Sequence, residues 1–411
     1  MDYAALCSAV SEEAALRRRQ RLQPVGGQGD KIFPPTYPGE RRGDPARHVL
    51  ERRRIAGEDR WCALVDSVQS QANRLEESLL AALREGAVEI PHVTVDFTGK
   101  GLAGITEITS LDAPHRIYDA ILRDSLLDSE LFPKSALGKR LAEARMAEAA
   151  AVLEVSPTAL LFGAWNSTGE GGGLAAKFPR CLVSEIAAIG VSVEEAGADP
   201  RTGEIEFRTG ARRTGSRIDP LGVLRKVEVW KGDSRQWDVN KAAAGKNAKK
   251  VRPSEINHGN IMPSVVPLGI SCDHAEHVAV ISFAGLRRLG FGGGARDAAG
   301  RAYLAALGLL ALAEQDARGY ALRSRCDLVC EGRAPIERVR ADGSVEPVEL
   351  DRAATRRLYA AALAAARDSG LNLETKPLRL VPQDKLVKIV AESQRLALEG
   401  EGGEADADAE G

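Results

Sequence analysis

The stretch that decides the fold joins a strand to a helix: Trp61-Cys-Ala-Leu-Val65 is followed by Asp66-Ser-Val-Gln-Ser-Gln-Ala-Asn-Arg-Leu-Glu76. The apolar run Trp61–Val65 predicts a strand. Asn73, with Glu76 three residues later, has the pattern of a helix N-terminus, and Gly86 has the pattern of a helix end. The helix would bury a stripe of leucines on one side, namely Leu75, Leu79, Leu80 and Leu83.

Outward from this unit, strands and helices alternate irregularly and without an internal repeat. We expect strands over residues 88–97, 204–207, 222–230, 277–283 and 325–329. We expect helices over residues 139–153, 299–318, 352–367 and 385–398, the third with Asp351 as its N-cap. Because strands come from distant segments and mix with helices, the sequence predicts the α+β class.

Length and composition indicate a soluble globular protein. The chain has 411 residues, of which 44% are hydrophobic and 28% charged, which allows two or three domains, or one domain with large insertions. It contains neither a run of roughly 20 apolar residues nor a secretory signal. Its six cysteines lie far apart except for Cys326 and Cys330, which we expect in the core. We therefore expect a cytoplasmic protein.

Charge is distributed unevenly, which the formal net charge of −2 hides. Residues 17–54 hold 11 Lys/Arg and 4 Asp/Glu, and residues 201–252 hold 14 and 6. Segment 399–411 holds six acids among Gly and Ala, which predicts a disordered tail and leaves the body at +4. Clustered cations among Gly and Pro suit a surface that follows a polyanion, and a solvated basic face without a partner is the alternative.

Other kinds of site find little support. Cys272, Asp273, His274 and His277 are metal-ligand types, but no second Cys/His pair completes a zinc set. The glycine clusters at 169–173 and 290–294 lack the Gly-Lys-Ser/Thr of a P-loop, so an enzyme that binds a small molecule is a remote alternative. Aromatic residues make up only 4%, which counts against a protein that holds bases mainly by stacking. We expect no metal, no cofactor and no catalytic residue.

Side chains suited to a sugar–phosphate backbone recur near the basic segments. Long cations supply charge, and short hydroxyls and amides supply directed hydrogen bonds. Two of these residues have an alternative explanation without RNA. Arg74 could be an exposed helix residue, and Arg217 could form a salt bridge to Asp219. The candidate RNA-binding residues are Gln69, Ser70, Asn73, Arg74, Lys177, Arg180, Arg212, Arg213, Ser216, Arg217, Lys249, Lys250 and Arg252.

Five stretches resemble one family. Besides Asp66–Glu76, they are Lys31-Ile-Phe-Pro-Pro-Thr-Tyr37, Ala176-Lys-Phe178, Gly215-Ser-Arg-Ile-Asp-Pro-Leu-Gly222 and Pro253-Ser-Glu-Ile-Asn-His-Gly-Asn-Ile261. Together, over roughly residues 30–330, they resemble the RAMP-superfamily backbone subunit, the group-seven Cas protein, of type I-G (formerly type I-U) CRISPR surveillance complexes.

The resemblance implies a modified RRM-like (ferredoxin-like) palm with finger and thumb insertions over residues 31–398, after an N-terminal arm over 1–30. Residues 240–266 are the thumb candidate, and residues 194–215 are the alternative. The family's phosphate contacts would fall on Gln69, Asn73, Arg74, Lys177, Arg217 and Lys250.

The resemblance also implies partners. Copies of the subunit would stack head to tail in a helical filament along the CRISPR RNA (crRNA), which pairs with the target DNA strand in antiviral defence. The other subunits of such a Cascade complex are a large subunit, a guide-processing or capping subunit and a recruited helicase-nuclease. The alternative is a RAMP subunit that cleaves target RNA with a loop aspartate, here Asp66 or Asp219, although capping of the turn before Pro220 also explains Asp219.

Overall fold

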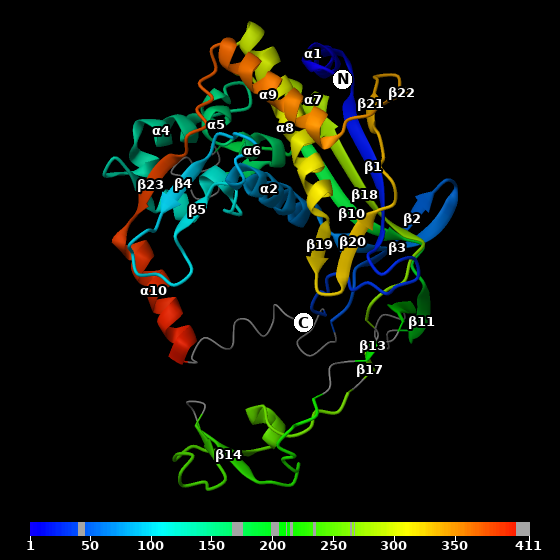
Figure 1. The fold of residues 1–411 in the computed structure, drawn as a ribbon, viewed down its shortest axis with the longest axis vertical. Helices are drawn as coiled ribbons and strands as arrows, with labels where there is room; N and C mark the ends of the chain where they lie inside the picture. Colours follow the sequence, from blue (N-terminus) through cyan, green and yellow to red (C-terminus); the bar gives the residue numbers. More distant parts are fainter. Residues whose placement is uncertain are drawn as a thin grey trace.

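The structure, a computed structural model, describes residues 1–39, 46–166, 176–198, 205–210, 212–213, 217–232, 236–263, 265–266 and 268–399. An antiparallel sheet lies at its centre, with the strand order β19-β20-β1-β18-β10-β3-β2 (Figure 1). These strands are β1 Ala15–Pro24, β2 Leu50–Ile55, β3 Glu58–Asp66, β10 Leu182–Ile189, β18 His274–Ser282, β19 Tyr320–Arg323 and β20 Cys326–Cys330. Strands β21 Ile336–Val339 and β22 Val345–Val348 extend the sheet beside β1.

Helices pack against one face of this sheet and form the main core. They are α1 Tyr3–Glu12, α2 Val68–Arg84, α7 Phe283–Arg287, α8 Gly294–Arg318 and α9 Arg352–Asp368. Helix α8 lies directly on the sheet at Gly308, where a Cβ would come within 2.8 Å of Ile281 Cδ1 and 3.1 Å of Leu182 Cδ1. The small residue therefore sets the close approach of helix and sheet.

A second, smaller sheet has the order β5-β4-β23-β6-β7 and joins the C-terminal part of the chain to residues near 100. Its strands are β4 Val93–Asp96, β5 Glu107–Thr109, β6 Ser125–Leu127, β7 Glu130–Leu131 and β23 Leu378–Pro382. The helices around it are η1 Arg116–Tyr118, α3 Ala120–Arg123, η2 Phe132–Lys134, α4 Ala136–Glu143, α5 Ala150–Val155, α6 Pro157–Phe162 and α10 Asp384–Glu399. The short hairpin of β8 Ala164–Trp165 and β9 Lys177–Phe178 precedes β10.

Between β10 and β18 the chain leaves the body. A hairpin of β11 Val193–Ala198 and β12 Ile205–Thr209 comes first. Residues 212–266, called the excursion below, then extend away from the central sheet (Figure 1). The excursion contains β13 Arg212–Arg213, β14 Val229–Lys231, β15 Trp237–Asp238, β16 Lys249–Val251, η4 Pro253–Ile256 and β17 Val265–Val266, and the β13–β17 pair closes its base. Both thumb candidates lie in this connection.

The residues expected as an N-terminal arm, 1–30, contain a helix and a strand of the body. Helix α1 packs into the core, and β1 pairs with β18 on one side and with β20 and β21 on the other. The basic run is a strand because its side chains alternate: Leu16, Arg18 and Leu22 are buried, whereas Arg17 and Arg19 point to the open face. Tertiary burial of this pattern outweighs the turn and charge signals around it.

Two other helices differ from their predicted bounds because of contacts that a local sequence pattern does not reveal. The N-cap of α2 lies six residues earlier than expected, at Ser67 in place of Asn73, and the Ser67 hydroxyl accepts from the Ser70 N–H. The helix expected over residues 139–153 is two helices. The residues between these two helices form backbone hydrogen bonds with Gly290 in place of helical ones. The Gly290 carbonyl accepts from the Ala149 N–H at 2.7 Å, and the Gly290 N–H donates to the Met146 carbonyl at 2.7 Å.

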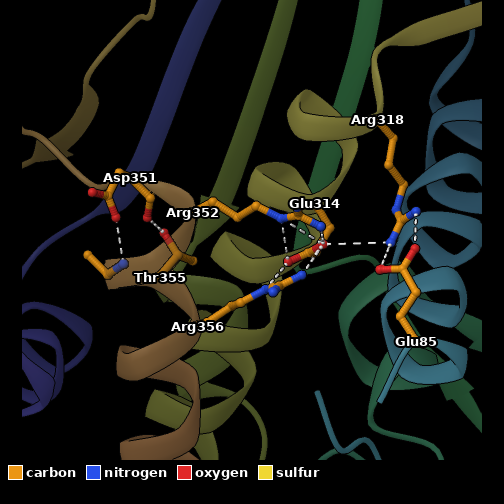
Figure 2. Close-up of polar contacts among 8 residues, drawn as sticks. Glu85, Glu314, Arg318, Asp351, Arg352, Thr355 and Arg356 are labelled. Atoms are coloured by element: carbon orange, nitrogen blue, oxygen red, sulfur yellow. Dashed lines mark hydrogen bonds and ion pairs between the residues drawn. The ribbon is translucent and has the colours of Figure 1, made fainter. Parts of the chain in front are cut away.

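A buried carboxylate joins α8 to α9 (Figure 2). The fully buried side chain of Glu314 accepts hydrogen bonds from Arg352 at 2.7 Å and from Arg356 at 2.7 Å. Arg318, one turn further along α8, donates to Glu85 of α2 at 2.9 Å. Charged groups thus connect three of the helices that cover the sheet.

Among the described residues, no helix combines the length and hydropathy that crossing a bilayer requires. The six cysteines are free thiols; Cys326 is buried, as expected, whereas Cys330 is only partly buried.

Candidate nucleic-acid interface

The basic segment 17–54 does not supply a free cationic surface along β1. Arg17 pairs with Glu337 at 2.5 Å, Arg19 with Glu276 at 3.0 Å and Arg21 with Glu331 at 3.2 Å. Each acid lies on a neighbouring part of the sheet but is more than 250 residues away in sequence, since these side chains share the open face of β1, β18 and the β20–β21 region. The cations of this strand are therefore neutralised within the fold.

The N-terminal half of α2 carries four of the candidate RNA-binding residues. Gln69 and Asn73, one turn apart, are exposed, and Ser70 is half-buried. Arg74 is held in the body instead: its Nε donates to Asp66 at 3.1 Å, and a terminal nitrogen donates to the Leu322 carbonyl at 2.6 Å. The amides are thus available to a ligand, whereas Arg74 mainly fixes α2 against β3 and β19.

A chain of buried polar side chains continues from Asp66 into the core. Gln71 donates to Asp66 at 2.6 Å, and the Ser184 hydroxyl lies 3.3 Å from the Gln71 amide oxygen. Ser184 also lies 2.5 Å from Nε2 of His277, whose Nδ1 is 3.1 Å from the Arg18 guanidinium. Burial, helped by the Arg18 charge, holds the pKa of His277 well below its ordinary value. This His is therefore neutral and structural.

A second buried link connects α2 to the β8–β9 hairpin. Glu76 accepts from Arg116 at 2.8 and 2.7 Å, and Arg116 also donates to the Gly163 carbonyl at 3.0 Å. Arg180 packs over Gly163, where an added Cβ would meet the Arg180 Cγ at 3.0 Å. Glu76 therefore neutralises Arg116, while Arg180 is exposed and forms no ion pair with any described residue.

Lys177, three residues before Arg180, faces an exposed tryptophan. The β8–β9 pairing places Lys177 directly across from Trp165, and the Lys177 ammonium is 5.2 Å from the centroid of the Trp165 ring. Trp165 is 58% exposed. The glycine cluster at 169–173 lies outside the described residues. Trp165 was missed in the sequence analysis, although a tryptophan in a Gly-, Ser- and Asn-rich setting is itself a signal for a surface role.

In the excursion, two stretches quoted in the sequence analysis meet. Asp219 accepts from the Gly259 N–H at 2.6 Å, and its own N–H donates to the Asn260 side chain at 2.8 Å. A backbone bridge joins Arg217 to Ile261, and the Arg217 guanidinium donates to the Asn257 carbonyl and lies 3.9 Å from Asp219. Backbone N–H groups, that of Gly259 first, lower the pKa of Asp219, so the carboxylate is a structural acceptor.

The excursion also carries cations with few acidic partners. Lys249 and Arg252 are exposed, and Lys250 pairs with Glu228. A recess of about 270 Å³ is lined by Arg225, Lys226, Val227, Glu228, Lys250, Val251, Arg252 and Glu255, and so brings two further cations to Lys250 and Arg252. Arg225 and Lys226 were not singled out from the sequence. Arg212 and Arg213 form β13, but their side chains and the whole of Ser216 lie outside what the structure describes.

The described candidates fall on two parts of the chain, the body and the excursion. The body group consists of Gln69, Ser70 and Asn73 of α2 with Lys177 and Arg180, and the excursion group consists of Arg217, Lys249, Lys250 and Arg252. No hydrogen bond or ion pair between described residues joins the groups, and the excursion stands apart from α2 in Figure 1.

The residues considered for other chemistry do not assemble into a site. In the described part of the chain, no three His, Cys, Asp or Glu side chains come together as metal ligands. Asp273 pairs with Arg60 at 3.1 Å, whereas His277 is buried beside Ser184. Asp66 and Asp219, considered for RNA cleavage, are both buried and accept the hydrogen bonds described above.

A known protein-family model matches part of the chain. Residues 16–193 match the family model described as CRISPR-associated protein GSU0053 (Cas_GSU0053). This range runs from β1 to the start of β11 and so includes α2, Trp165, Lys177 and Arg180, whereas the excursion lies beyond it. No curated protein matches the chain.

Proposed function

From the premise that residues 16–193 are those of a CRISPR-associated protein of the Cas_GSU0053 family, we propose that the chain is the backbone subunit that binds the guide RNA in a type I-G CRISPR surveillance complex. The match itself implies a role in CRISPR defence. The backbone role, the type and the partners are the steps that the proposal adds.

The order of the central strands supports an RRM-like palm. Strand β1 is followed by helix α2 and strand β10, and β18 is then followed by helix α8 and the β19–β20 pair. In space the order is β20-β1-β18-β10, so the third of these strands lies between the first and the second, and the fourth lies beside the first. This is the arrangement of a βαββαβ unit, to which the β2–β3 hairpin adds an edge.

The observation that carries the proposal is the set of exposed cations that the fold leaves without an acidic partner among the described residues. Lys177 and Arg180 belong to this set in the body, and Arg225, Lys226 and Arg252 belong to it in the excursion. By contrast, the cations of β1 are paired. Unpaired cations, together with the exposed amides of Gln69 and Asn73, suit contacts to phosphate and sugar, which carry no sequence information.

Such contacts agree with a subunit that accepts any guide and leaves sequence reading to base pairing with the target DNA strand. Because the two cation groups are separate within one chain, the proposal has the guide pass from the body of one copy to the excursion of another. This requires head-to-tail stacking in a filament that does not close. The large subunit, the capping subunit and the helicase-nuclease would join that filament. RNA cleavage by Asp66 or Asp219 gains no support, since both carboxylates are occupied by hydrogen bonds within the fold.

Co-expression with a guide RNA tests the proposal. The purified protein is expected to carry RNA as an assembly of several copies, and its affinity should fall steeply as salt rises, because phosphate contacts release counterions. Guides of unrelated sequence should bind equally. Absence of RNA, or binding that salt does not weaken, would contradict the proposal. Metal-dependent cleavage of a paired RNA, lost in Asp66→Ala or Asp219→Ala, would replace it with the nuclease alternative.

A further inference from the structure

We propose that Trp165, Lys177 and Arg180 form a binding site for one nucleotide of single-stranded RNA, with the base stacked on the Trp165 ring and the phosphates held by the two cations. The inference rests on the proposed function, because it specifies how the body holds the guide at one point. It adds a single stacking contact to a protein whose composition counts against holding bases mainly by stacking.

The position of Trp165 is the first support. Its 58% exposure leaves a large aromatic surface in water, and Lys177, 5.2 Å from the ring centroid, covers one face. Trp61 differs, because it packs on Phe207 with ring centroids 4.6 Å apart and also lies under Arg52. Trp165 has no ring contact with any described residue except Lys177. The exposed part of the ring can receive a base, and stacking of this kind tolerates any base.

The charge around Trp165 is the second support. Lys177 and Arg180 are exposed and unpaired among the described residues, while the nearby Arg116 is already neutralised by Glu76. Burial lowers the pKa of Arg180 from its ordinary value, and the neighbouring Arg116 charge adds to this. A phosphate beside Arg180 would relieve that repulsion and form a charge-assisted hydrogen bond.

A ring and a cation paired across the β8–β9 hairpin, with a second cation two residues after it, fit a nucleotide better than they fit an acidic peptide. A peptide carboxylate would engage Lys177 and Arg180 but would leave the Trp165 ring unused. A nucleotide uses all three, because it combines a flat base with a phosphate on each side. Substitution of Trp165 alone therefore separates the two kinds of ligand.

The test measures the affinity of the full chain for an oligoadenylate and for an abasic ribose-phosphate strand of equal length. Trp165→Ala should bind the oligoadenylate roughly ten-fold more weakly, the usual scale for loss of one base–aromatic stack, and should bind the abasic strand nearly as the wild type does. Trp165→Phe should retain most of the affinity. Quenching of tryptophan fluorescence by RNA should also decrease in Trp165→Phe. The matched control is Trp237→Ala, which removes a 46%-exposed ring from the excursion.

The outcomes separate this inference from the proposal beneath it. If the wild type binds RNA and Trp165→Ala binds the oligoadenylate equally well, the stacking site is wrong and the backbone role stands. An equal loss on the abasic strand, or in Trp237→Ala, would also overturn the site. If the wild type binds neither strand at low salt, both the site and the proposed function fail. Trp165→Phe gives the answer through fluorescence if the alanine variant folds poorly.

Discussion

Glu76 of α2 accepts two hydrogen bonds from the Arg116 guanidinium, at 2.8 and 2.7 Å, where both side chains are at most 7% exposed. Burial raises the pKa of Glu76 to about 7, although Arg116 opposes this shift. Arg116 also donates to the Gly163 carbonyl, over which Arg180 packs. The pair therefore stabilises the core and also positions the hairpin that carries the candidate RNA contacts.

Removal of Glu76 should cost considerable stability. Glu76→Ala leaves the Arg116 charge buried without its acid, and breaking a buried pair in this way costs about 3 kcal/mol or more. Urea denaturation followed by circular dichroism measures the free energy of unfolding. The matched control is Glu77→Ala, one residue along α2 and exposed, which should change that free energy little. Similar losses of unfolding free energy in the two variants would show that the buried pair stabilises the fold no more than a surface carboxylate does.

The positions of the main helices could be predicted from the sequence, because their signals are local. The leucine stripe and Gly86 mark α2, the long apolar pattern marks α8, and Asp351 caps α9 by accepting from the Ala354 N–H, as predicted. The N-terminal strand could not be predicted in this way. The acids that neutralise Arg17, Arg19 and Arg21 come from residues 276–337, so only the folded sheet shows that this basic run is paired.

The same limit applies to the candidate site. The residue types were recognisable, but pairing decides which of them can bind RNA. Arg74 is occupied by Asp66 and a carbonyl, whereas Arg180 remains unpaired among the described residues. Trp165 was overlooked because its significance depends on the cross-strand position of Lys177. A list of donor types from sequence therefore contains the cations of the site but omits its aromatic ring and does not delimit it.

Arg180→Ala should weaken RNA binding about equally for unrelated sequences and make the dependence of log affinity on log salt shallower by about one, since one phosphate contact is lost. The control is Arg19→Ala, which removes another exposed arginine, but one paired with Glu276 at 3.0 Å on the open sheet face. Filter binding at several salt concentrations measures both. A larger loss in Arg19→Ala than in Arg180→Ala would move the interface to the sheet face.

Glu314 should contribute more to the free energy of unfolding than Glu85, which also pairs with Arg318 (Figure 2). Burial alone would raise the pKa of Glu314, but hydrogen bonds from Arg356 and Arg352 outweigh it and lower the pKa. Glu314→Gln leaves these two arginines facing each other, and we expect a loss of about 2 kcal/mol in the free energy of unfolding. Glu85→Gln, at the surface, should be nearly neutral. Equal changes in the free energy of unfolding for Glu314→Gln and Glu85→Gln would contradict the prediction.

Acidification should destabilise the protein through His277. Its pKa is depressed in the folded state by burial and by Arg18, so below its ordinary value of about 6.5 only the unfolded chain takes up the proton. Its contribution to stability therefore decreases as pH falls below about 6.5, by up to about 1.4 kcal/mol per pH unit. Glu76, with its raised pKa, acts in the opposite direction over part of this range.

Comparison of the wild type with His277→Gln isolates this effect, because Glu76 is present in both. Denaturation at pH 7.5, 6.5 and 5.5 should show a shallower loss of stability toward acid in the variant. A pH dependence identical to that of the wild type would mean that His277 does not titrate differently in the two states.

Arg217 should matter for the shape of the excursion as well as for its charge. Its guanidinium donates to the Asn257 carbonyl and lies 3.9 Å from Asp219, so it fastens the segment 217–222 to the segment 257–261. Arg217→Ala should increase protease cleavage within residues 217–262, leave the melting temperature of the body unchanged, and weaken guide binding to the same extent for unrelated sequences.

Arg225→Ala, which removes an exposed cation without an ion pair among the described residues, should weaken binding but not increase cleavage. Because the two variants remove the same charge, the difference between them measures the fastening role. A loss of binding confined to one guide sequence would indicate base readout and contradict the model of phosphate contacts.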